Sequence, residues 1–291
     1  MNPIRTCVFP CAGFGTRFLP ATKAIPKEMI PLVDKPVIQY GVEEAIASGL
    51  DRIVIVTSRG KDSIIEHFDR NEELERNLSE NGKTDLLALV REVSTLASIV
   101  AVRQKDPRGL GHAVASAREA VGDEPFAVSL PDDVILADVP CLEQMKRVFV
   151  ETGRPVIALM KVAPDETSRY GIVAGEAIDE RLFRITDMVE KPKSNPPSNY
   201  AIIGRYILLP EIFDVLDGTK PGSGGEVQIT DAIRDLIADG GVYGFVFEGK
   251  RYDAGVKLGW LQATVDYGLN RPEFATEFRI YLEQILERTR K

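Results

Sequence analysis

A glycine-rich segment near the N-terminus carries the residues best suited to hold phosphate. It reads FPCAGFGTRFLPATKAIPKEM from Phe9 to Met29 and combines a strand end, a turn and several cations. Gly13 and Gly15 allow backbone conformations that other residues avoid, so consecutive backbone N–H groups can face an anion. Arg17 adds planar donors and Lys27 a mobile point charge. The segment predicts a cradle for a polyphosphate, with a plain strand-to-helix turn as the alternative.

Two well-known glycine motifs do not fit this segment. A dinucleotide fingerprint needs a third small residue where Phe18 stands, and a P-loop needs Lys followed by Ser or Thr after its last glycine. A nicotinamide oxidoreductase is therefore disfavoured. Glu28, beside Lys27, is a candidate for reading a nucleobase, and a surface carboxylate paired with Lys27 is the simpler interpretation.

A second glycine pair follows the strand expected at 99–103. In the sequence RQKDPRGLGHA, Gln104 offers an amide donor and an acceptor, which suit the edge of a pyrimidine. Gly109 and Gly111 relax the loop, and the N-terminus of the following helix favours anions and a close backbone approach. A nucleotide contact and a plain strand-to-helix loop both remain open here.

Carboxylates occur where open α/β sheets bind their ligands. The strand at 126–130 runs into Pro131, Asp132 and Asp133, which places acids at a strand's carboxyl end. Mg²⁺ is typically held by one or two carboxylates plus phosphate oxygens, and Asp253 in RYDAGVKLGW is the candidate for the other ligand. Asp132 and Asp133 both remain open as the metal ligand at this point, and adjacent aspartates are also common in turns and caps.

A further polar group combines Gly171 with Glu190 and Lys191, the last two at the end of the strand expected at 183–189. A carboxylate can accept hydrogen bonds from two sugar hydroxyls, and a neighbouring lysine can hold a sugar phosphate. A polar hairpin end is the alternative. The nearby phosphate cradle favours the sugar-phosphate interpretation.

Composition restricts the class of protein. The chain has 291 residues, a formal net charge of −8 and a pI of about 5.1. Because nucleic-acid binding normally rests on a basic face, this balance argues against it. Three cysteines without a CxxC pair fit a reducing compartment, and neither a signal-peptide core nor a membrane span is visible. We expect a cytoplasmic location, and we interpret His67 and His112 as ordinary surface or cap residues.

The elements that position these groups alternate in the first half of the chain. Short β-branched runs are followed by amphipathic segments, which predicts repeated βα units, and after Pro155 strands follow one another with few helices. We therefore expect an α/β fold whose mixed sheet has an antiparallel part. Strands are expected at 6–9, 52–57, 99–103, 126–130, 156–161, 171–174, 183–189 and 201–208, and helices near 37–47, 61–68, 112–121, 141–151 and 231–238.

The C-terminal tail predicts a helix with one apolar face. Phe274, Phe278, Leu282 and Ile285 recur at helical spacing after Pro272. This face is expected to pack on the body of the protein or on another subunit.

On these motifs the chain resembles the bacterial UTP:glucose-1-phosphate uridylyltransferases, also called UDP-glucose pyrophosphorylases, of the sugar-nucleotidyltransferase superfamily. The resemblance runs nearly end to end. The matching segments are AGFGTRFLPATKAIPKEM from Ala12, KPVIQY from Lys35, GLGHA from Gly109, LPDD from Leu130, VEKP from Val189 and GGEVQITDAI from Gly224. Thymidylyltransferases of the superfamily typically carry glutamine where this chain has Glu28. A homologous group that lost activity has a disrupted GTR segment, which is intact here.

The resemblance implies a Rossmann-like mixed β-sheet flanked by helices, with an antiparallel sugar-binding portion. It implies one nucleotidyltransferase domain over 1–291, with a nucleotide-binding half to about 152, a sugar-phosphate-binding half to about 256, and C-terminal helices that are a candidate oligomer contact. The implied contacts are Ala12, Gly13, Gly15, Glu28, Gln104 and Gly109 for the nucleotide, Arg17 and Lys27 for its triphosphate, Asp132 and Asp253 for Mg²⁺, and Gly171, Glu190 and Lys191 for glucose 1-phosphate.

The implied reaction is in-line attack by a phosphate oxygen of glucose 1-phosphate on the α-phosphorus of UTP, giving UDP-glucose and pyrophosphate. A phosphomonoester has a second pKa of about 6, so its oxygen is largely ionised and needs no general base. Neutralising anionic charge is then the catalytic task, for which Arg17, Lys27, Lys191 and the metal held by Asp132 are the candidates.

Two other functions stay in view. One is a nucleotidyltransferase for another pair, such as dTTP with a sugar 1-phosphate, and the other is a catalytically silent regulatory homologue that binds a nucleotide sugar. In each case we expect a homodimer or homotetramer, with neither nucleic acid nor a membrane as a partner.

Overall fold

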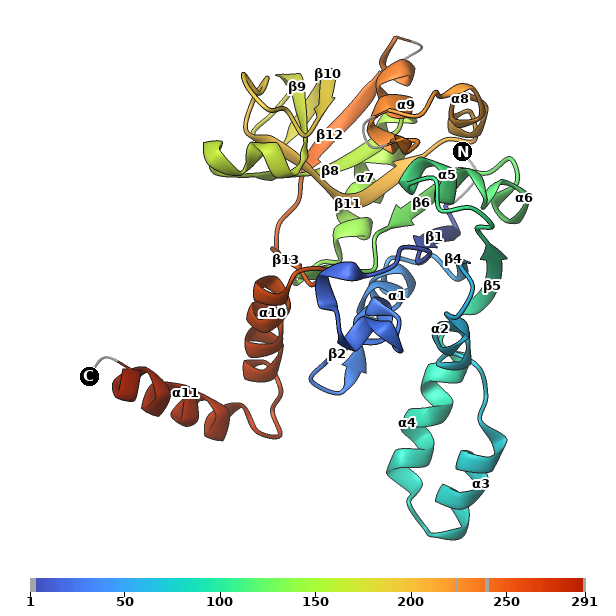
Figure 1. The fold of residues 1–291 in the computed structure, drawn as a ribbon, viewed down its shortest axis with the longest axis vertical. Coiled ribbons are helices and arrows are strands. Elements are labelled where there is room, and N and C mark those ends of the chain that lie inside the picture. The colour runs from blue at the N-terminus through green and yellow to red at the C-terminus, as the bar shows by residue number, and fades with distance from the viewer. Residues whose placement is uncertain (1–3, 223–224, 239–240, 290–291) are drawn as a thin grey trace.

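A nine-stranded mixed sheet runs through the computed structural model, which describes residues 4–222, 225–238 and 241–289 (Figure 1). The strand order is β5-β4-β1-β6-β11-β8-β12-β10-β9. The first four strands run parallel to one another, whereas β11 is antiparallel to both of its main neighbours, and β10 is antiparallel to β12 and β9. The predicted mixed α/β fold with an antiparallel part is therefore confirmed.

The strands of this sheet lie close to the predicted ranges, except β12, which was not predicted. They are β1 (Thr6–Pro10), β4 (Arg52–Thr57), β5 (Ser98–Arg103), β6 (Phe126–Ser129), β8 (Val156–Lys161), β9 (Gly171–Ala177), β10 (Leu182–Glu190), β11 (Tyr200–Leu208) and β12 (Val242–Val246). Two short pairs stand apart from it: β2 (Pro31–Leu32) with β3 (Lys35–Pro36), and β7 (Asp133–Leu136) with β13 (Lys250–Asp253).

Helices cover both faces of the sheet because successive strand residues point to opposite sides. Cys7 and Phe9 of β1 pack with one helix group, whereas Val8 packs with the other. The first group is α1 (Val37–Ala47), α2 (Asp62–Glu66) and α7 (Cys141–Thr152), and the second is α5 (Leu110–Ala115), α6 (Arg118–Val121), α8 (Ile212–Gly218) and α9 (Ile229–Ile237). The single helix predicted at 112–121 is thus two short helices.

Two helix pairs project from this body (Figure 1). One is α3 (Glu72–Glu80) with α4 (Thr84–Thr95), and the other is α10 (Lys257–Leu269) with α11 (Ala275–Thr289). None of the described residues of α11 is buried, so its apolar side is left largely uncovered by the body. No described helix has the length and apolar character needed to cross a bilayer.

Three short 3₁₀ helices lie in the glycine-rich segment and a fourth forms a later turn. They are η1 (Thr16–Phe18), η2 (Ala21–Lys23), η3 (Lys27–Met29) and η4 (Pro164–Arg169). The motif GGEVQITDAI is described from Gly225 onward, because Gly224 lies outside the described residues.

A fully buried arginine holds the turn that follows β6. Arg205 of β11 donates to Glu44 on α1, with Nη2 and Oε2 2.7 Å apart. Its guanidinium also donates to the backbone carbonyls of Leu130, Gly204 and Asp133, at 3.2, 2.9 and 2.7 Å. One side chain therefore fixes the backbone on both sides of the predicted metal-binding residue Asp132.

Candidate active site

A cavity of about 570 Å³ brings together residues from distant parts of the chain. It lies where β1 and β6 end, and most of the predicted nucleotide and metal residues line it. These are Ala12, Gly13, Gly15, Arg17, Lys27, Gln104, Gly109 and Asp132, joined by Glu226 and Gly255. Glu226, within the GGEVQITDAI motif, was not singled out from the sequence.

The glycine loop is folded tightly over Lys27. Gly15 has a φ of 66°, in the left-handed region that favours glycine, and a Cβ there would lie 3.0 Å from Cβ of Lys27. Thr22 closes the loop by donating from Oγ1 to the Gly15 carbonyl at 2.8 Å. Arg17 stays exposed at the cavity, where its donors are available to a ligand.

An ion pair connects the glycine-rich segment to Asp132. Lys27 Nζ lies 2.6 Å from Asp132 Oδ2, and both side chains are about one-fifth exposed. Burial opposes both charges, but the charge and hydrogen bond of Asp132 together with the charge of Glu28 raise the pKa of Lys27, while the charge and hydrogen bond of Lys27 lower the pKa of Asp132. Both groups are consequently charged at neutral pH.

Asp132 and Asp253 converge on Gly255. A Cβ at Gly255 would lie 2.5 Å from Asp132 Oδ2 and 3.0 Å from Asp253 Oδ1, so only glycine leaves room for both carboxylates. Gly255 also donates its N–H to Asp253 Oδ1 at 3.1 Å. Burial raises the pKa of Asp253, although Arg251 opposes the shift.

Asp133, the alternative metal ligand, is already saturated by protein donors. Arg251 donates to its Oδ1 from Nε at 2.9 Å and from Nη2, and the Gly204 N–H donates to its Oδ2 at 2.6 Å. Its side chain is only 6% exposed, against 23% for Asp132. The contacts assign Asp133 to the scaffold and leave Asp132 facing the cavity.

The donor set of Asp132 and Asp253 fits Mg²⁺. Magnesium is usually bound by one or two carboxylates together with substrate phosphates and water. Within residues 4–222, 225–238 and 241–289, no cluster of three or more acidic, histidine or cysteine side chains could hold a metal. A metal on this pair would thus need ligands from a substrate.

Glu28 lies beneath the glycine loop instead of on the cavity wall. Its carboxylate is fully buried and accepts from Lys61 Nζ at 2.8 and 3.1 Å, and Lys61 also donates to the Cys11 carbonyl. Burial raises the pKa of Glu28, and the charge of Lys61 opposes this. The simpler interpretation, a surface pair with Lys27, is wrong, and the base contact stays a prediction. Sequence reasoning missed Lys61, which has no local signal.

Gln104 is buried and contacts a histidine. Its amide Nε2 lies 2.7 Å from His112 Nδ1 and 3.3 Å from the Gly109 carbonyl oxygen. His112 is not a helix cap, because α5 begins at Leu110, and its partly exposed imidazole faces Gln104. A histidine directly after Gly111 is a weak signal for such a contact.

The predicted sugar group is assembled around Glu190. Thr230 donates to Glu190 Oε2 at 2.8 Å, and a Cβ at Gly171 would lie 3.1 Å from that same oxygen. Lys191 Nζ is 3.2 Å from Glu190 Oε1 and its side chain is 59% exposed. Thr230, in the first turn of α9, therefore orients the carboxylate.

Two contacts connect the sugar group to the rest of the site. Arg251, which holds Asp133, also donates to the Tyr170 hydroxyl at 3.3 Å. On the nucleotide side, Val227 donates its N–H to the Arg108 carbonyl at 2.8 Å and accepts from the Gly111 N–H at 2.9 Å. The segment that leads into α9 is therefore tied to the loop that carries Gly109.

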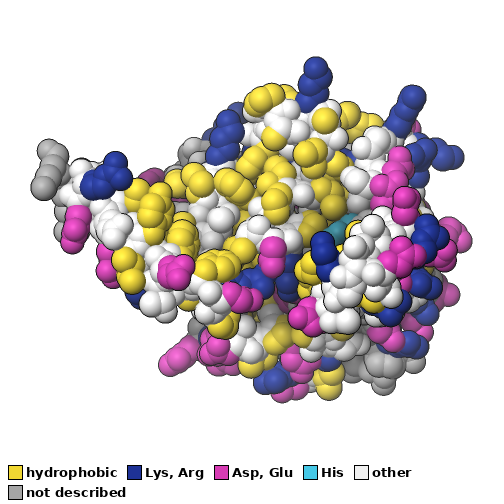
Figure 2. All heavy atoms as spheres, turned by 90° about the horizontal axis from the view of Figure 1, so that it is seen from below, with side chains coloured by type: hydrophobic (Ala, Val, Ile, Leu, Met, Phe, Trp, Pro, Cys, Tyr) yellow, Lys and Arg dark blue, Asp and Glu magenta, His cyan; other side chains and the backbone are white. Residues whose placement is uncertain are grey.

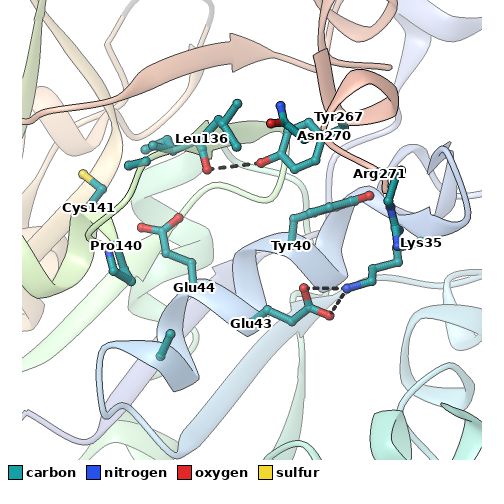
Figure 3. Close-up of a pocket in the computed structure, with 13 residues that line it drawn as sticks. Lys35, Tyr40, Glu43, Glu44, Leu136, Pro140, Cys141, Tyr267, Asn270 and Arg271 are labelled. Carbon is teal, nitrogen blue, oxygen red and sulfur yellow. Dashed lines mark hydrogen bonds and ion pairs between the residues drawn. The ribbon is translucent and has the colours of Figure 1, made fainter. Parts of the chain in front are cut away.

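A separate cavity of about 380 Å³ lies between α1, β7 and α10 (Figure 3). Its charged groups are already paired, since Lys35 donates to both oxygens of Glu43 at 2.7 and 3.0 Å. Tyr267 donates to the Ile135 carbonyl at 3.2 Å. Glu44, on its wall, is held by Arg205. None of the predicted substrate residues lines this cavity, so we place the active site at the larger one.

Comparison with known proteins gives consistent relatives. Residues 11–268 match the nucleotidyl transferase family. The UTP–glucose-1-phosphate uridylyltransferase of Bacillus subtilis (strain 168) is 47% identical over 289 residues, which cover 99% of each chain. The enzyme of the same name from Staphylococcus haemolyticus (strain JCSC1435) is 48% identical, over 98% of this chain and 99% of the relative.

Solved structures agree with these sequence relatives. A UDP-glucose pyrophosphorylase complexed with UDP-glucose superposes with a TM-score of 0.85 at 43% identity, covering 92% of this chain and all of the other. The UTP-bound UGPase from Acinetobacter baumannii gives a TM-score of 0.89 at 38% identity, covering 96% and 98%. The resemblance inferred from the sequence motifs is confirmed.

The two adjacent aspartates should differ in their effect on stability. We expect Asp133→Asn to lower the free energy of unfolding by about 3 kcal/mol, because it leaves the buried Arg251 without its main counter-ion. Asp132→Asn should cost about 1 kcal/mol or less, since Asp132 and Lys27 both reach the cavity. Urea denaturation of both variants measures the difference, and equal losses would contradict these separate roles.

Proposed function

This chain belongs to the nucleotidyl transferase family, and we propose that it transfers the uridylyl group of UTP to glucose 1-phosphate, giving UDP-glucose and pyrophosphate. The observation that carries the proposal is a single cavity in which the glycine loop, the Lys27–Asp132 pair and Gln104 meet. Its full-length relatives are named for this reaction.

Charge neutralisation is the main task of the site. The attacking oxygen of glucose 1-phosphate and the α-phosphate of UTP are both anionic, so their approach is opposed unless cations lie close by. Arg17 and Lys27 stand at the cavity and would hold the triphosphate as the bond from the α-phosphorus to the bridging oxygen breaks. The leaving pyrophosphate takes up the negative charge.

The sugar phosphate is assigned to the second half of the site. Glu190, oriented by Thr230, would accept from sugar hydroxyls, and the exposed Lys191 would bind the phosphate. Gly171 lies against Glu190, where a larger residue would crowd the carboxylate. Positioning two bound substrates for in-line attack supplies much of the rate enhancement.

Asp132 and Asp253 would hold Mg²⁺ together with substrate oxygens. When bound, the metal would withdraw charge from the phosphates and help to align them. Lys27, paired with Asp132, keeps that carboxylate ionised and placed at the cavity. The two carboxylates themselves need no proton transfer in this scheme.

Pyrophosphate release tests the reaction directly. We expect release with UTP, glucose 1-phosphate and MgCl₂ together, and none when any one of the three is left out. The assay is repeated with dTTP and with other sugar 1-phosphates. A preference for dTTP would replace the proposed substrate, and no release with any pair would end the enzyme assignment.

The metal assignment is tested by titrating MgCl₂ against turnover. Asp132→Asn and Asp253→Asn should each lower kcat by roughly 100-fold or more at saturating substrates and raise the Mg²⁺ concentration needed for half-maximal rate. Asp123→Asn, an exposed acid in the turn after α6, is the matched control and should leave both unchanged. Wild-type magnesium dependence in both site variants would remove these residues from the metal site.

We also infer that the chain forms a homo-oligomer through its C-terminal helices. An apolar groove of about 490 Å³ runs between η2, η3 and α10, lined mainly by Phe18, Ile25, Met29, Ile30, Trp260 and Leu261. Figure 2 shows hydrophobic side chains gathered on the projecting C-terminal arm and on the body beside it. Because such continuous apolar surface marks interaction sites, we assign a second copy of the chain as the occupant.

Sedimentation equilibrium tests this assembly. We expect the wild type to be a dimer or tetramer and Leu261→Glu to shift it toward monomer, because the charge would be buried at the contact. Leu261 is 52% exposed in the single chain, so the fold should tolerate the change. Val150→Glu, at an apolar position on α7 that is 65% exposed, is the control. A monomeric wild type would refute the assembly.

Two further expectations belong to the proposal. The nucleotide and sugar-phosphate halves act as one unit, supported by the sheet that runs through both. A cytoplasmic location is supported by Cys7, Cys11 and Cys141, which are all buried free thiols.

A further inference from the structure

The amide of Gln104 presents one of its two ends to the nucleotide cavity. The residue follows β5 and is 5% exposed, and it lines the cavity beside Ala12 and Gly109. Its Nε2 has two partners, His112 Nδ1 and the Gly109 carbonyl, whereas its Oε1 has none among the residues described. This oxygen is not buried either, because the buried side-chain N and O atoms without a partner in the described chain are Thr6 Oγ1 and Ser129 Oγ. It is therefore open to a ligand.

The Gly109 carbonyl decides which way this amide points. A carbonyl oxygen can only accept, so the amide atom 3.3 Å from it must be the NH₂ group. The same NH₂ group lies 2.7 Å from His112 Nδ1, which must then accept as well. A neutral imidazole accepts at one nitrogen and donates at the other, so the proton of His112 is on Nε2.

One contact opposes this arrangement. Arg108 Nη2 lies 2.8 Å from His112 Nε2, and two donors cannot bond to each other. Arg108 is an exposed, flexible side chain that can turn away, whereas the Gly109 carbonyl belongs to the backbone and accepts the Ala113 N–H of α5 at 3.1 Å. The reverse assignment would place the Gln104 oxygen 3.3 Å from another carbonyl oxygen. The backbone contact therefore prevails.

We propose that His112 is a positioning residue for base selection: it holds the Gln104 amide so that its oxygen faces the cavity and accepts the imide N–H of a uracil ring. Cytosine has an unprotonated ring nitrogen at that place, so it would meet the Gln104 oxygen with a second acceptor. Burial, aided by the charge of Arg108, lowers the pKa of His112 and keeps it neutral, as this role requires. The inference rests on the proposed function and adds to it the contact that would favour UTP over CTP.

The ratio of kcat/KM for UTP to kcat/KM for CTP, measured by pyrophosphate release with saturating glucose 1-phosphate, tests the proposal. His112→Ala should lower this ratio about tenfold, because the NH₂ group then keeps only its 3.3 Å contact with the Gly109 carbonyl and the amide turns more readily to donate to cytosine. His112→Asn places an acceptor oxygen near the position of Nδ1 and should restore most of the preference. His67→Asn changes the other histidine and should leave the ratio as in the wild type.

Arg108→Ala separates the two amide orientations. If the Gly109 carbonyl sets the amide, the ratio stays within twofold of the wild type, and a tenfold loss would show instead that Arg108 sets the tautomer and overturn the assignment. An unchanged ratio in a folded, active His112→Ala variant would overturn the role of His112 alone. A wild type that releases no pyrophosphate from UTP would overturn the proposed function, and this inference with it.

Discussion

The site depends on the buried contact between Arg205 and Glu44. A guanidinium removed from water is stable only when its charge is matched and its donors are used, and here one carboxylate and three backbone carbonyls do this. The carbonyls of Leu130 and Asp133 flank Pro131 and Asp132, so the buried guanidinium also fixes this turn. Asp132 can face the cavity because its neighbours have no freedom to move.

The charged side chains at the cavity contrast with the net charge of the chain. The chain is acidic overall, yet Arg17 and Lys27 both line the cavity proposed for two anionic substrates. Lys27 and Arg251 have fixed partners, and so they arrange acids as well as attract phosphates. Arg17, which stays exposed, is left to meet the ligand.

Sequence reasoning succeeded where a signal was local. The range of α1 and the parallel start of the sheet follow from apolar periodicity, and the glycine loop follows from residues that are adjacent in the chain. The pair β7 and β13 was largely missed because two four-residue strands from distant segments carry little pattern of their own. The sequence residues alone left Asp132 and Asp133 open, and the contacts that distinguish them, from Arg251 and Gly204 to Asp133, come from distant parts of the chain.

Partners that lie far apart in the chain explain the other differences. Glu28 is buried because Lys61 reaches it from the segment after β4, and no residue next to Glu28 in the sequence predicts that contact. The contact made by His112 likewise depends on Gln104, which lies on the other side of a loop. The sequence thus gives the type of a charged or polar side chain, but its partner is known only once the fold is known.

The bonds of Val227 give the two halves of the site a shared mechanical path. This residue is bonded in both directions to the loop around Gly109, and the chain then enters α9, where Thr230 holds Glu190. A ligand that shifted this loop would therefore be expected to shift Glu190 as well. Linkage is reciprocal, so two ligands coupled in this way would each change the affinity for the other by the same factor. One short stretch of backbone would then carry the coupling between the two halves of the cavity.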